Sequence, residues 1–216
     1  MSAADIKTLR QRTGAGILDC KKALEENGGD LDASIDWLRA KGIASAAKKS
    51  GRIASEGLVI SYIHAGGKIG VLLEVNCETD FVAINDGFKD LCHDIAMHIA
   101  AAGPEYISKD EVSEDAVERE RQVQLQRVME EGKPEHIAER IVEGRMGKYF
   151  EEVCLLEQKF IKDDKKTVGE VVTDAVARIG ENIRVRRFER YVLGEGLEKR
   201  SDDFAAEVAA QMGGES

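Results

Sequence analysis

The sequence predicts an α+β protein, in which a small bundle of three helices precedes a three-stranded antiparallel sheet packed with helices and a helical hairpin. Three observations support this fold class. Apolar residues recur at helical spacing over residues 1–42, two β-rich runs flank Ala65-Gly66-Gly67, and helical spacing returns after residue 85. Only two prolines occur among the 216 residues, so long uninterrupted helices are allowed.

Residues 1–42 predict three short helices that together form one small domain. The first helix is expected to end at residues 13–16, the second at Gly28-Gly29, and the third begins at Asp30, a favourable N-cap. Residues 43–55 are small and basic, which is typical of a partly helical linker. The apolar residues that give this domain its helical spacing are Ile6, Leu9, Ile17, Leu18, Cys20, Ala23, Leu24, Leu31, Ile35, Trp37 and Leu38.

Residues 56–216 form the second predicted domain. Residues 58–64 and 68–76 are rich in β-forming residues and predict the two strands of a β-hairpin. The glycines between them supply the positive φ angles that a tight turn needs. Residues 182–192 alternate between apolar and polar side chains, so they predict a third strand that completes the sheet.

The remaining residues of this domain favour helices. They are expected over about residues 86–102, 113–131, 134–160, 168–179 and 202–212. Glu131-Gly132-Lys133-Pro134 is a turn signal, so the second and third of these helices fold back on each other as a helical hairpin at about residues 113–160.

The charge of the chain bears on its partners. The formal net charge is −10, with 41 acidic and 31 basic residues. Such a surface repels phosphate backbones and anionic lipids, so neither nucleic acid nor a membrane is an expected partner. No run approaches the roughly 18 apolar residues of a membrane helix, and the first residues lack a signal-peptide pattern. We therefore expect a cytoplasmic protein.

Catalytic and metal-binding side chains are not grouped in any recognisable pattern. The four cysteines form no CxxC pair and are expected to be buried apolar groups. Cys92 and His93 are helical neighbours about 100° apart and cannot pair, and His93 and His98 do not share a helix face. Gly66-Gly67-Lys68 lies in a hairpin, not before a helix, so it is no phosphate-binding loop. We expect no catalytic residue, no metal and no cofactor, and hence no enzyme.

Residues 74–83 carry most of the functional information. They begin as the end of a buried strand and place Asp80 and Phe81 side by side just before a helix. Two interpretations are open. Both side chains are exposed and can be inserted into another protein, or Phe81 turns inward and Asp80 caps the next helix. The residue types alone favour the second, because phenylalanine is commonly buried.

Two long segments resemble the bacterial elongation factor Ts family. Residues 9–24 resemble the N-terminal signature of that family, and residues 74–83 contain its Thr-Asp-Phe-Val motif at Thr79, Asp80, Phe81 and Val82. Shorter matches occur at residues 93–101, 142–146, 194–199 and 203–208. The resemblance covers nearly the whole chain in collinear order.

The resemblance implies a guanine-nucleotide exchange factor that acts on elongation factor Tu in translation. It implies that the N-terminal bundle is a ubiquitin-associated-like domain that docks on this partner. It also implies that Thr79, Asp80, Phe81 and Val82 displace the partner's Mg²⁺ beside its nucleotide. Arg12, Lys21 and Lys22 are the basic residues that we expect to assist docking.

The chain differs from long family members, which repeat the hairpin-and-helix unit that occurs once here. A second copy of the chain would supply the missing half, so we expect a homodimer. An adaptor or chaperone is the alternative from another functional class, because three-helix domains recur in unrelated proteins. A thiol enzyme that uses Cys92 or Cys154 is a third alternative.

Overall fold

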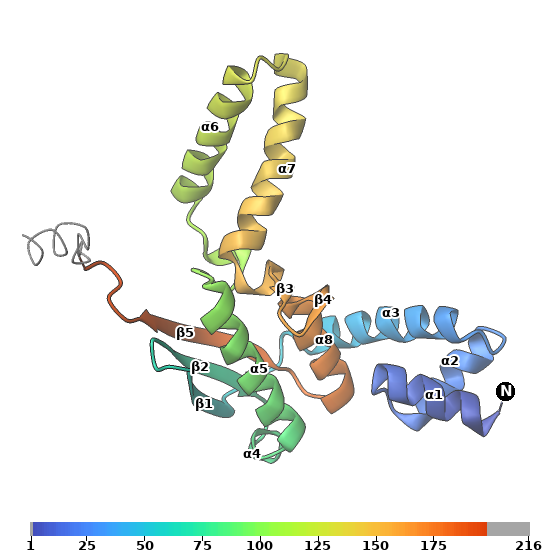
Figure 1. Ribbon diagram of the computed structural model, residues 1–216. Helices are drawn as coiled ribbons and strands as arrows, with labels where there is room; N and C mark the ends of the chain where they lie inside the picture. Colours follow the sequence, from blue (N-terminus) through green and yellow to red (C-terminus); the bar gives the residue numbers. More distant parts are fainter. Residues whose placement is uncertain (1, 198–216) are drawn as a thin grey trace, which may run out of the picture.

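The computed structural model describes residues 2–197, apart from the side chains of residues 135 and 136. Figure 1 shows a three-stranded sheet crossed by helices, with a three-helix bundle at one end of the molecule and a long helical hairpin projecting from its middle. This arrangement confirms the predicted α+β class. Within residues 2–197, no helix combines the length and the apolar character that a membrane span requires. The helix expected at residues 202–212 lies outside the described residues.

The N-terminal bundle consists of α1 (Ala3–Thr13), α2 (Ile17–Glu26) and α3 (Leu31–Lys49). Gly14 ends α1 in the left-handed conformation, and the side chain of Asp30 caps α3 by accepting a hydrogen bond from the Ala33 amide. The buried centre of the bundle is small and mainly aliphatic, consisting of Leu9, Cys20, Ala23 and Leu24.

Helix α3 continues beyond residue 42, where the sequence predicted its end. It runs without interruption to Lys49, because the alanines and lysines that follow Gly42 are strong helix formers. This part of α3 packs on α8 (Val168–Ile179), and a Cβ at Gly42 would lie 3.3 Å from the Cβ of Ala177. Arg39 forms an ion pair with Glu170 on α8. Much of the expected linker is therefore a rigid extension of the bundle.

The sheet contains β1 (Glu56–Ile63), β2 (Ile69–Cys77) and β5 (Arg184–Val192) in the order β1-β2-β5. Both pairs are antiparallel, which confirms the predicted third strand beside the hairpin. Gly57 has φ 137°, and a Cβ at this position would lie 2.1 Å from the backbone oxygen of Val75. Only glycine fits where β1 approaches β2 so closely.

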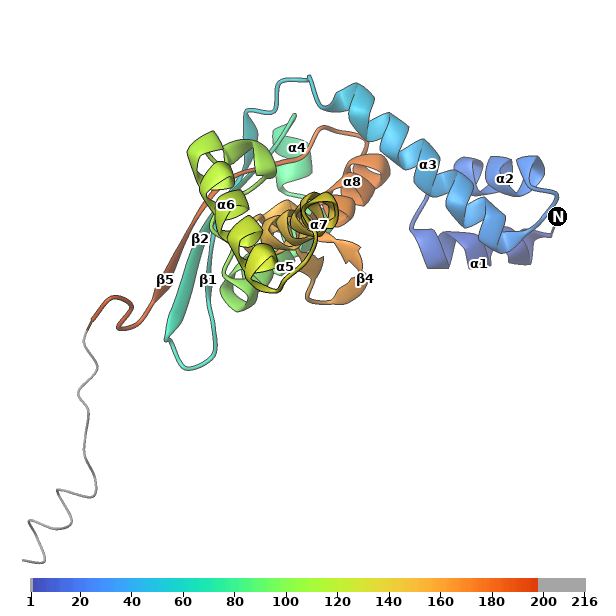
Figure 2. The ribbon, with the colours of Figure 1, turned by 90° about the horizontal axis from the view of Figure 1, so that it is seen from above.

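One face of the sheet is covered and the other is open. Helix α5 (Asp86–Ala102) crosses the covered face, and α8 lies on the same side, as Figure 2 shows. The core between them includes Val71, Leu73, Val75 and Phe88. Alternation along the strands turns a second set of side chains to the opposite side. We call this the outer sheet face, and its residues include Val59, Ile63, Leu72, Glu74, Arg187 and Tyr191.

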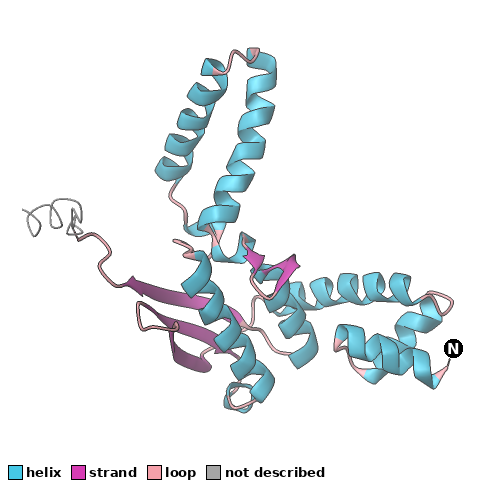
Figure 3. Cartoon of the chain, viewed as in Figure 1, coloured by secondary structure: helices cyan, strands magenta, loops and turns pink. Residues whose placement is uncertain are grey.

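The helical hairpin consists of α6 (Glu114–Glu130) and α7 (Glu135–Val153), after a short 3-10 turn at Lys109–Glu111. The prediction that the second arm continues to residue 160 was wrong. Cys154 is extended and forms a bridge with Tyr106, and a 3-10 turn (Leu155–Glu157) then buries Leu155 in the core. Figure 3 shows the small hairpin that follows, formed by β3 (Lys159–Phe160) and β4 (Asp163–Thr167).

Candidate functional site at the end of strand β2

The chain turns sharply where β2 ends. A single helical turn, α4 (Asp80–Ala83), follows β2 after two residues. Thr79 is its N-cap, and its hydroxyl oxygen accepts a hydrogen bond from the Val82 amide at 3.4 Å. Asp80 is the first residue of the helix and not its cap, so the alternative in which Asp80 caps the helix is wrong.

The side chains of α4 divide between the core and the surface. Ala83 is buried, and Val82 packs partly against the core beneath the sheet. Asp80 is exposed, and Phe81 is 77% exposed. The alternative in which Phe81 turns inward is therefore wrong, and of the four residues in the motif only Asp80 and Phe81 present whole side chains outward.

Ile84 is a surface residue that the motif did not reveal. It follows α4 directly and is 67% exposed. Phe81 and Ile84 are three residues apart, so they lie on the same side of the helical turn. The exposed surface thus combines one carboxylate with two large apolar groups. The sequence alone does not indicate that Ile84 is exposed, because an isoleucine next to an alanine is more commonly a core residue.

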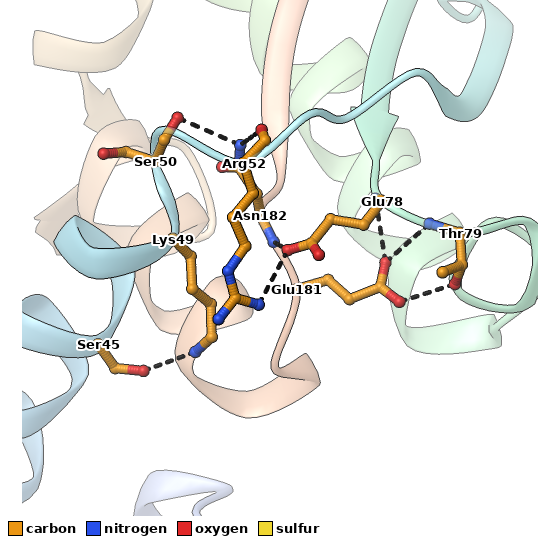
Figure 4. A network of polar contacts seen from close by, with 8 residues as sticks. All are labelled: Ser45, Lys49, Ser50, Arg52, Glu78, Thr79, Glu181 and Asn182. Atoms are coloured by element: carbon orange, nitrogen blue, oxygen red, sulfur yellow. Dashed lines mark hydrogen bonds and ion pairs between the residues drawn. The ribbon is translucent and has the colours of Figure 1, made fainter.

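Polar contacts from a distant segment hold this turn, as Figure 4 shows. Glu181 Oε2 accepts hydrogen bonds from the amides of Glu78 (3.0 Å) and Thr79 (3.1 Å), and Oε1 accepts one from the Thr79 hydroxyl (2.7 Å). Glu78 in turn accepts a hydrogen bond from the Asn182 amide at 2.6 Å. The two residues before Asp80 are therefore held by Glu181 through their backbone amides, and Glu78 is also held through its side chain by Asn182.

The basic residues expected to assist docking lie in the N-terminal bundle. Arg12 pairs with Asp32 at 3.0 Å, Lys21 lies 3.7 Å from Glu25, and Lys22 is exposed. Figures 1 and 2 show this bundle and α4 on separate parts of the molecule, so the structure does not bring the two sets of residues together.

An exposed apolar pair lies beside these basic residues. Ile17 and Leu18, at the start of α2, are 55% and 81% exposed. The sequence placed both at helical spacing with the core residues, and only the structure shows that they face outward. The bundle therefore offers an apolar surface with lysines next to it.

The cysteines do not form a nucleophilic site. All four are buried and free. Burial raises the pKa of Cys92 to about 12 and that of Cys154 to about 11. Such thiols carry almost no thiolate at neutral pH, which argues against the thiol-enzyme alternative. His98 is also a core residue, bonded through Nε2 to Gln158 Oε1 at 2.9 Å.

Known proteins resemble this chain over nearly its full length. The family model described as Elongation factor TS matches residues 45–195. Elongation factor Ts of Desulforamulus reducens is 61% identical over 212 residues, which cover 98% of each chain. The proteins of the same name from Geobacter metallireducens and Desulfitobacterium hafniense are 58% and 57% identical, over 99% and 98% of each chain. The chain therefore belongs to the elongation factor Ts family of translation elongation factors.

Proposed function

We propose that this protein is a guanine-nucleotide exchange factor for elongation factor Tu, and that Asp80 and Phe81 insert beside the partner's nucleotide. The observation that carries the proposal is the 77% exposure of Phe81 on a helical turn whose backbone is held by Glu181. A large apolar side chain held in water is unfavourable unless a partner covers it. Action in the cytoplasm remains a prediction.

The mechanism needs no covalent step. Mg²⁺ requires near-ideal octahedral geometry and bridges the phosphates of a bound nucleotide to few protein ligands. A small displacement of those ligands by Asp80 and Phe81 weakens nucleotide binding. By linkage, a factor that prefers the nucleotide-free partner weakens nucleotide binding by the same ratio, and about 4 kcal/mol of coupling corresponds to roughly a thousandfold change in affinity.

We assign docking to the N-terminal bundle. Ile17 and Leu18 supply the apolar contact, and the neighbouring Lys21 and Lys22 supply charge toward an acidic surface of the partner. Arg12 contributes less, because its guanidinium is already paired with Asp32. Docking and insertion are thus carried by different parts of the chain. An adaptor would use the bundle alone and has no need of an exposed Asp80-Phe81 turn.

Release of a fluorescent GDP analogue from elongation factor Tu tests the proposal. The wild-type chain is expected to accelerate release, and Phe81→Ala and Asp80→Ala are expected to lose most of the acceleration while remaining folded. Ile161→Ala, which removes a half-exposed apolar side chain on the β3–β4 turn, is the control and should keep the wild-type rate. Wild-type rates for both α4 variants would contradict the assignment of the turn.

We also propose a homodimer that is formed through the outer sheet face. Val59, Ile63, Leu72 and Tyr191 leave large apolar areas exposed there, and no described element covers them. The carboxylate of Glu74 at the centre of this face is paired with two arginines, so a second copy would not bury an unpaired carboxylate. Sedimentation should show a dimer, and Leu72→Lys a monomer. A wild-type monomer with full exchange activity at micromolar concentration would remove this proposal.

A further inference from the structure

We propose that Glu181 is a positioning residue for the Asp80-Phe81 turn, and that together with Glu78 and Asn182 it ties this turn to the segment that follows α3. We call Glu78, Glu181 and Asn182 the corner clamp. The inference rests on the proposed exchange function, because positioning matters only if the turn is inserted into a partner.

The place of Glu181 in the fold brings it to the end of β2. Gly180 ends α8 with φ 93°, a conformation that favours glycine, and reverses the chain toward β5. β5 pairs with β2 up to Asn76, so the residues that precede β5 lie beside those that follow β2. Residues 181 and 78 are thus neighbours although 103 positions separate them.

One carboxylate of the clamp satisfies three donors of the turn. The amides of Glu78 and Thr79 lie beyond the last paired residue of β2 and before α4, so neither has a ladder partner. Glu181 accepts from both, at 3.0 and 3.1 Å. Without this carboxylate, two partly buried amides would lose their acceptor and the turn would gain backbone freedom.

The bond from the Thr79 hydroxyl to Glu181 also fixes the start of α4. The Thr79 hydroxyl donates to Glu181 Oε1 at 2.7 Å, which leaves its oxygen free to accept from the Val82 amide. Glu181 therefore sets the rotamer of the N-cap, and the N-cap sets the first turn of the helix that contains Phe81. Phe81 has little packing of its own to orient it, so its direction depends on this backbone.

Glu78 and Asn182 connect the corner clamp to the segment that follows α3. Glu78 Oε1 accepts from the Asn182 amide at 2.6 Å and lies 3.4 Å from Arg52 Nη1. The buried Asn182 side chain donates to the carbonyl oxygens of Arg52 (2.8 Å) and Ser50 (3.3 Å). Figure 4 shows the contacts of Glu181 with the turn and those of Asn182 with this segment side by side. The turn that contains Phe81 and the segment that follows α3 are thus tied together at one corner.

Preorganisation gives the clamp its effect on exchange. A side chain held in its bound orientation avoids an ordering cost on insertion, and a displacement of about 1 Å at a reacting site can cost on the order of a hundredfold in rate. Docking through the bundle does not depend on the orientation of Phe81. Loss of Glu181 should therefore lower the maximal rate of nucleotide release more than it raises the concentration of factor needed for half of that rate.

The test compares Glu181→Ala with Glu181→Gln in the full chain. A glutamine oxygen can accept from both amides. Its nitrogen can donate to the Thr79 oxygen, which reverses this one bond but leaves a second lone pair for the Val82 amide, so the variant keeps the contacts of the turn without the charge. Glu151→Ala, which removes an exposed glutamate of α7, is the matched control. Thr79→Val is a second variant that removes the hydroxyl of the N-cap, and with it both the bond to Glu181 Oε1 and the bond from the Val82 amide.

Release of fluorescent GDP from elongation factor Tu is measured over a range of factor concentrations. We expect Glu181→Ala to lower the maximal rate about tenfold or more, and Glu181→Gln and Glu151→Ala to stay within about twofold of wild type. Thr79→Val should fall below wild type. Hydrogen exchange of the Val82 amide should accelerate in Glu181→Ala, while the chain stays folded at the assay temperature and its melting temperature falls by only several degrees, because the lost hydrogen bonds are confined to one turn.

The outcomes separate the two proposals. A wild-type chain that fails to accelerate release refutes the exchange function itself. A wild-type chain that accelerates release, with Glu181→Ala equally active at saturation, refutes only the role of Glu181. A glutamine variant as defective as the alanine variant would also refute it, because charge and not positioning would then be responsible. Unfolding of Glu181→Ala at the assay temperature, with a loss of rate equal to the unfolded fraction, would refute it as well, because the role of Glu181 would then be purely structural.

Discussion

Glu74 and Arg187 face each other across β2 and β5, and Arg187 Nε donates to Glu74 Oε2 at 2.6 Å. A β-bulge follows this pair, so Arg186 is an extra residue on β5 and donates to Glu74 Oε1 at 2.9 Å. The bulge therefore brings two guanidinium groups to one carboxylate. The carboxylate at the centre of the outer sheet face is therefore fully paired, and the network carries an excess of positive charge.

The Glu74 network predicts a loss of stability in acid. Hydrogen bonds from Arg186 and Arg187 lower the pKa of Glu74 from 4.5 to about 2. The folded state thus binds the proton more weakly than the unfolded state, so the stabilisation is complete above pH 4.5 and is lost as the pH falls toward 2. Urea unfolding of wild type and Glu74→Gln at pH 7, 4 and 3 measures this effect. The stability difference should shrink with acidification, and an equal difference at pH 7 and pH 3 would contradict the assignment.

Two phenylalanines seven positions apart should respond oppositely to truncation. Phe88 is completely buried under the sheet, so Phe88→Ala should lower the free energy of unfolding by about 3–5 kcal/mol. Phe81 is mostly exposed, so Phe81→Ala should change it by no more than about 0.5 kcal/mol. Chemical denaturation of both variants checks this. A strongly destabilised Phe81→Ala would mean that its effect on exchange cannot be ascribed to lost insertion.

Gly57 and Gly66 provide a matched pair of backbone tests. Gly66 lies at the β1–β2 turn with φ 86° and open space around it, so Gly66→Ala should cost about 1–2 kcal/mol of stability. Gly57→Ala adds a clash with the Val75 carbonyl oxygen and should cost more than about 3 kcal/mol. Thermal or urea unfolding ranks the two. Equal costs would show that β1 can move away from β2.

His98 predicts a second pH dependence, at the base of the helical hairpin. The Ile161 amide donates to Nδ1 at 3.2 Å, so Nε2 carries the proton and donates to Gln158. Burial lowers the pKa of His98 below 6.5, against the opposing effect of the Gln158 bond. Its stabilisation is therefore present above pH 6.5 and is lost as the pH falls through the folded-state value.

The variant His98→Asn isolates this effect. Asparagine keeps an acceptor for the Ile161 amide but does not titrate in this range. The nearby Asp94 is already paired with Lys162 at 2.8 Å, so local charge stays balanced in both proteins. The stability of the variant should change less than that of wild type between pH 7 and pH 5. Parallel pH profiles would exclude His98 as the titrating group.

Periodicity predicted the elements that have one apolar face. The strand formed by Arg184–Val192 and the helix formed by Val168–Ile179 could be found from the sequence because their spacing is regular. β4 could not be found, because Asp163–Thr167 is polar throughout and pairs only with two residues of β3. The end of α7 was missed because it depends on the contact of Cys154 with Tyr106, a tertiary interaction.

The candidate site shows a similar division. The family motif identified Asp80 and Phe81, but residue types alone favoured a buried phenylalanine, and only the resemblance reversed that expectation. Exposure at this turn depends on Thr79 as the N-cap and on Ala83, rather than Phe81, filling the space below. Glu181 lacks any sequence signal, because one glutamate after a helix-ending glycine contacts residues about a hundred positions away only through the sheet pairing.

Because α3 is one unbroken helix, its number of residues fixes the orientation of the bundle relative to the rest of the chain. At 1.5 Å and about 100° per residue, the 19 residues of α3 span about 28 Å with a defined rotational phase. A single inserted residue would turn the bundle by more than a quarter of a revolution relative to Phe81. For the proposed docking through the bundle, the length of α3 therefore matters as much as any exposed side chain, and inserted residues should be tolerated in the loops but not within α3.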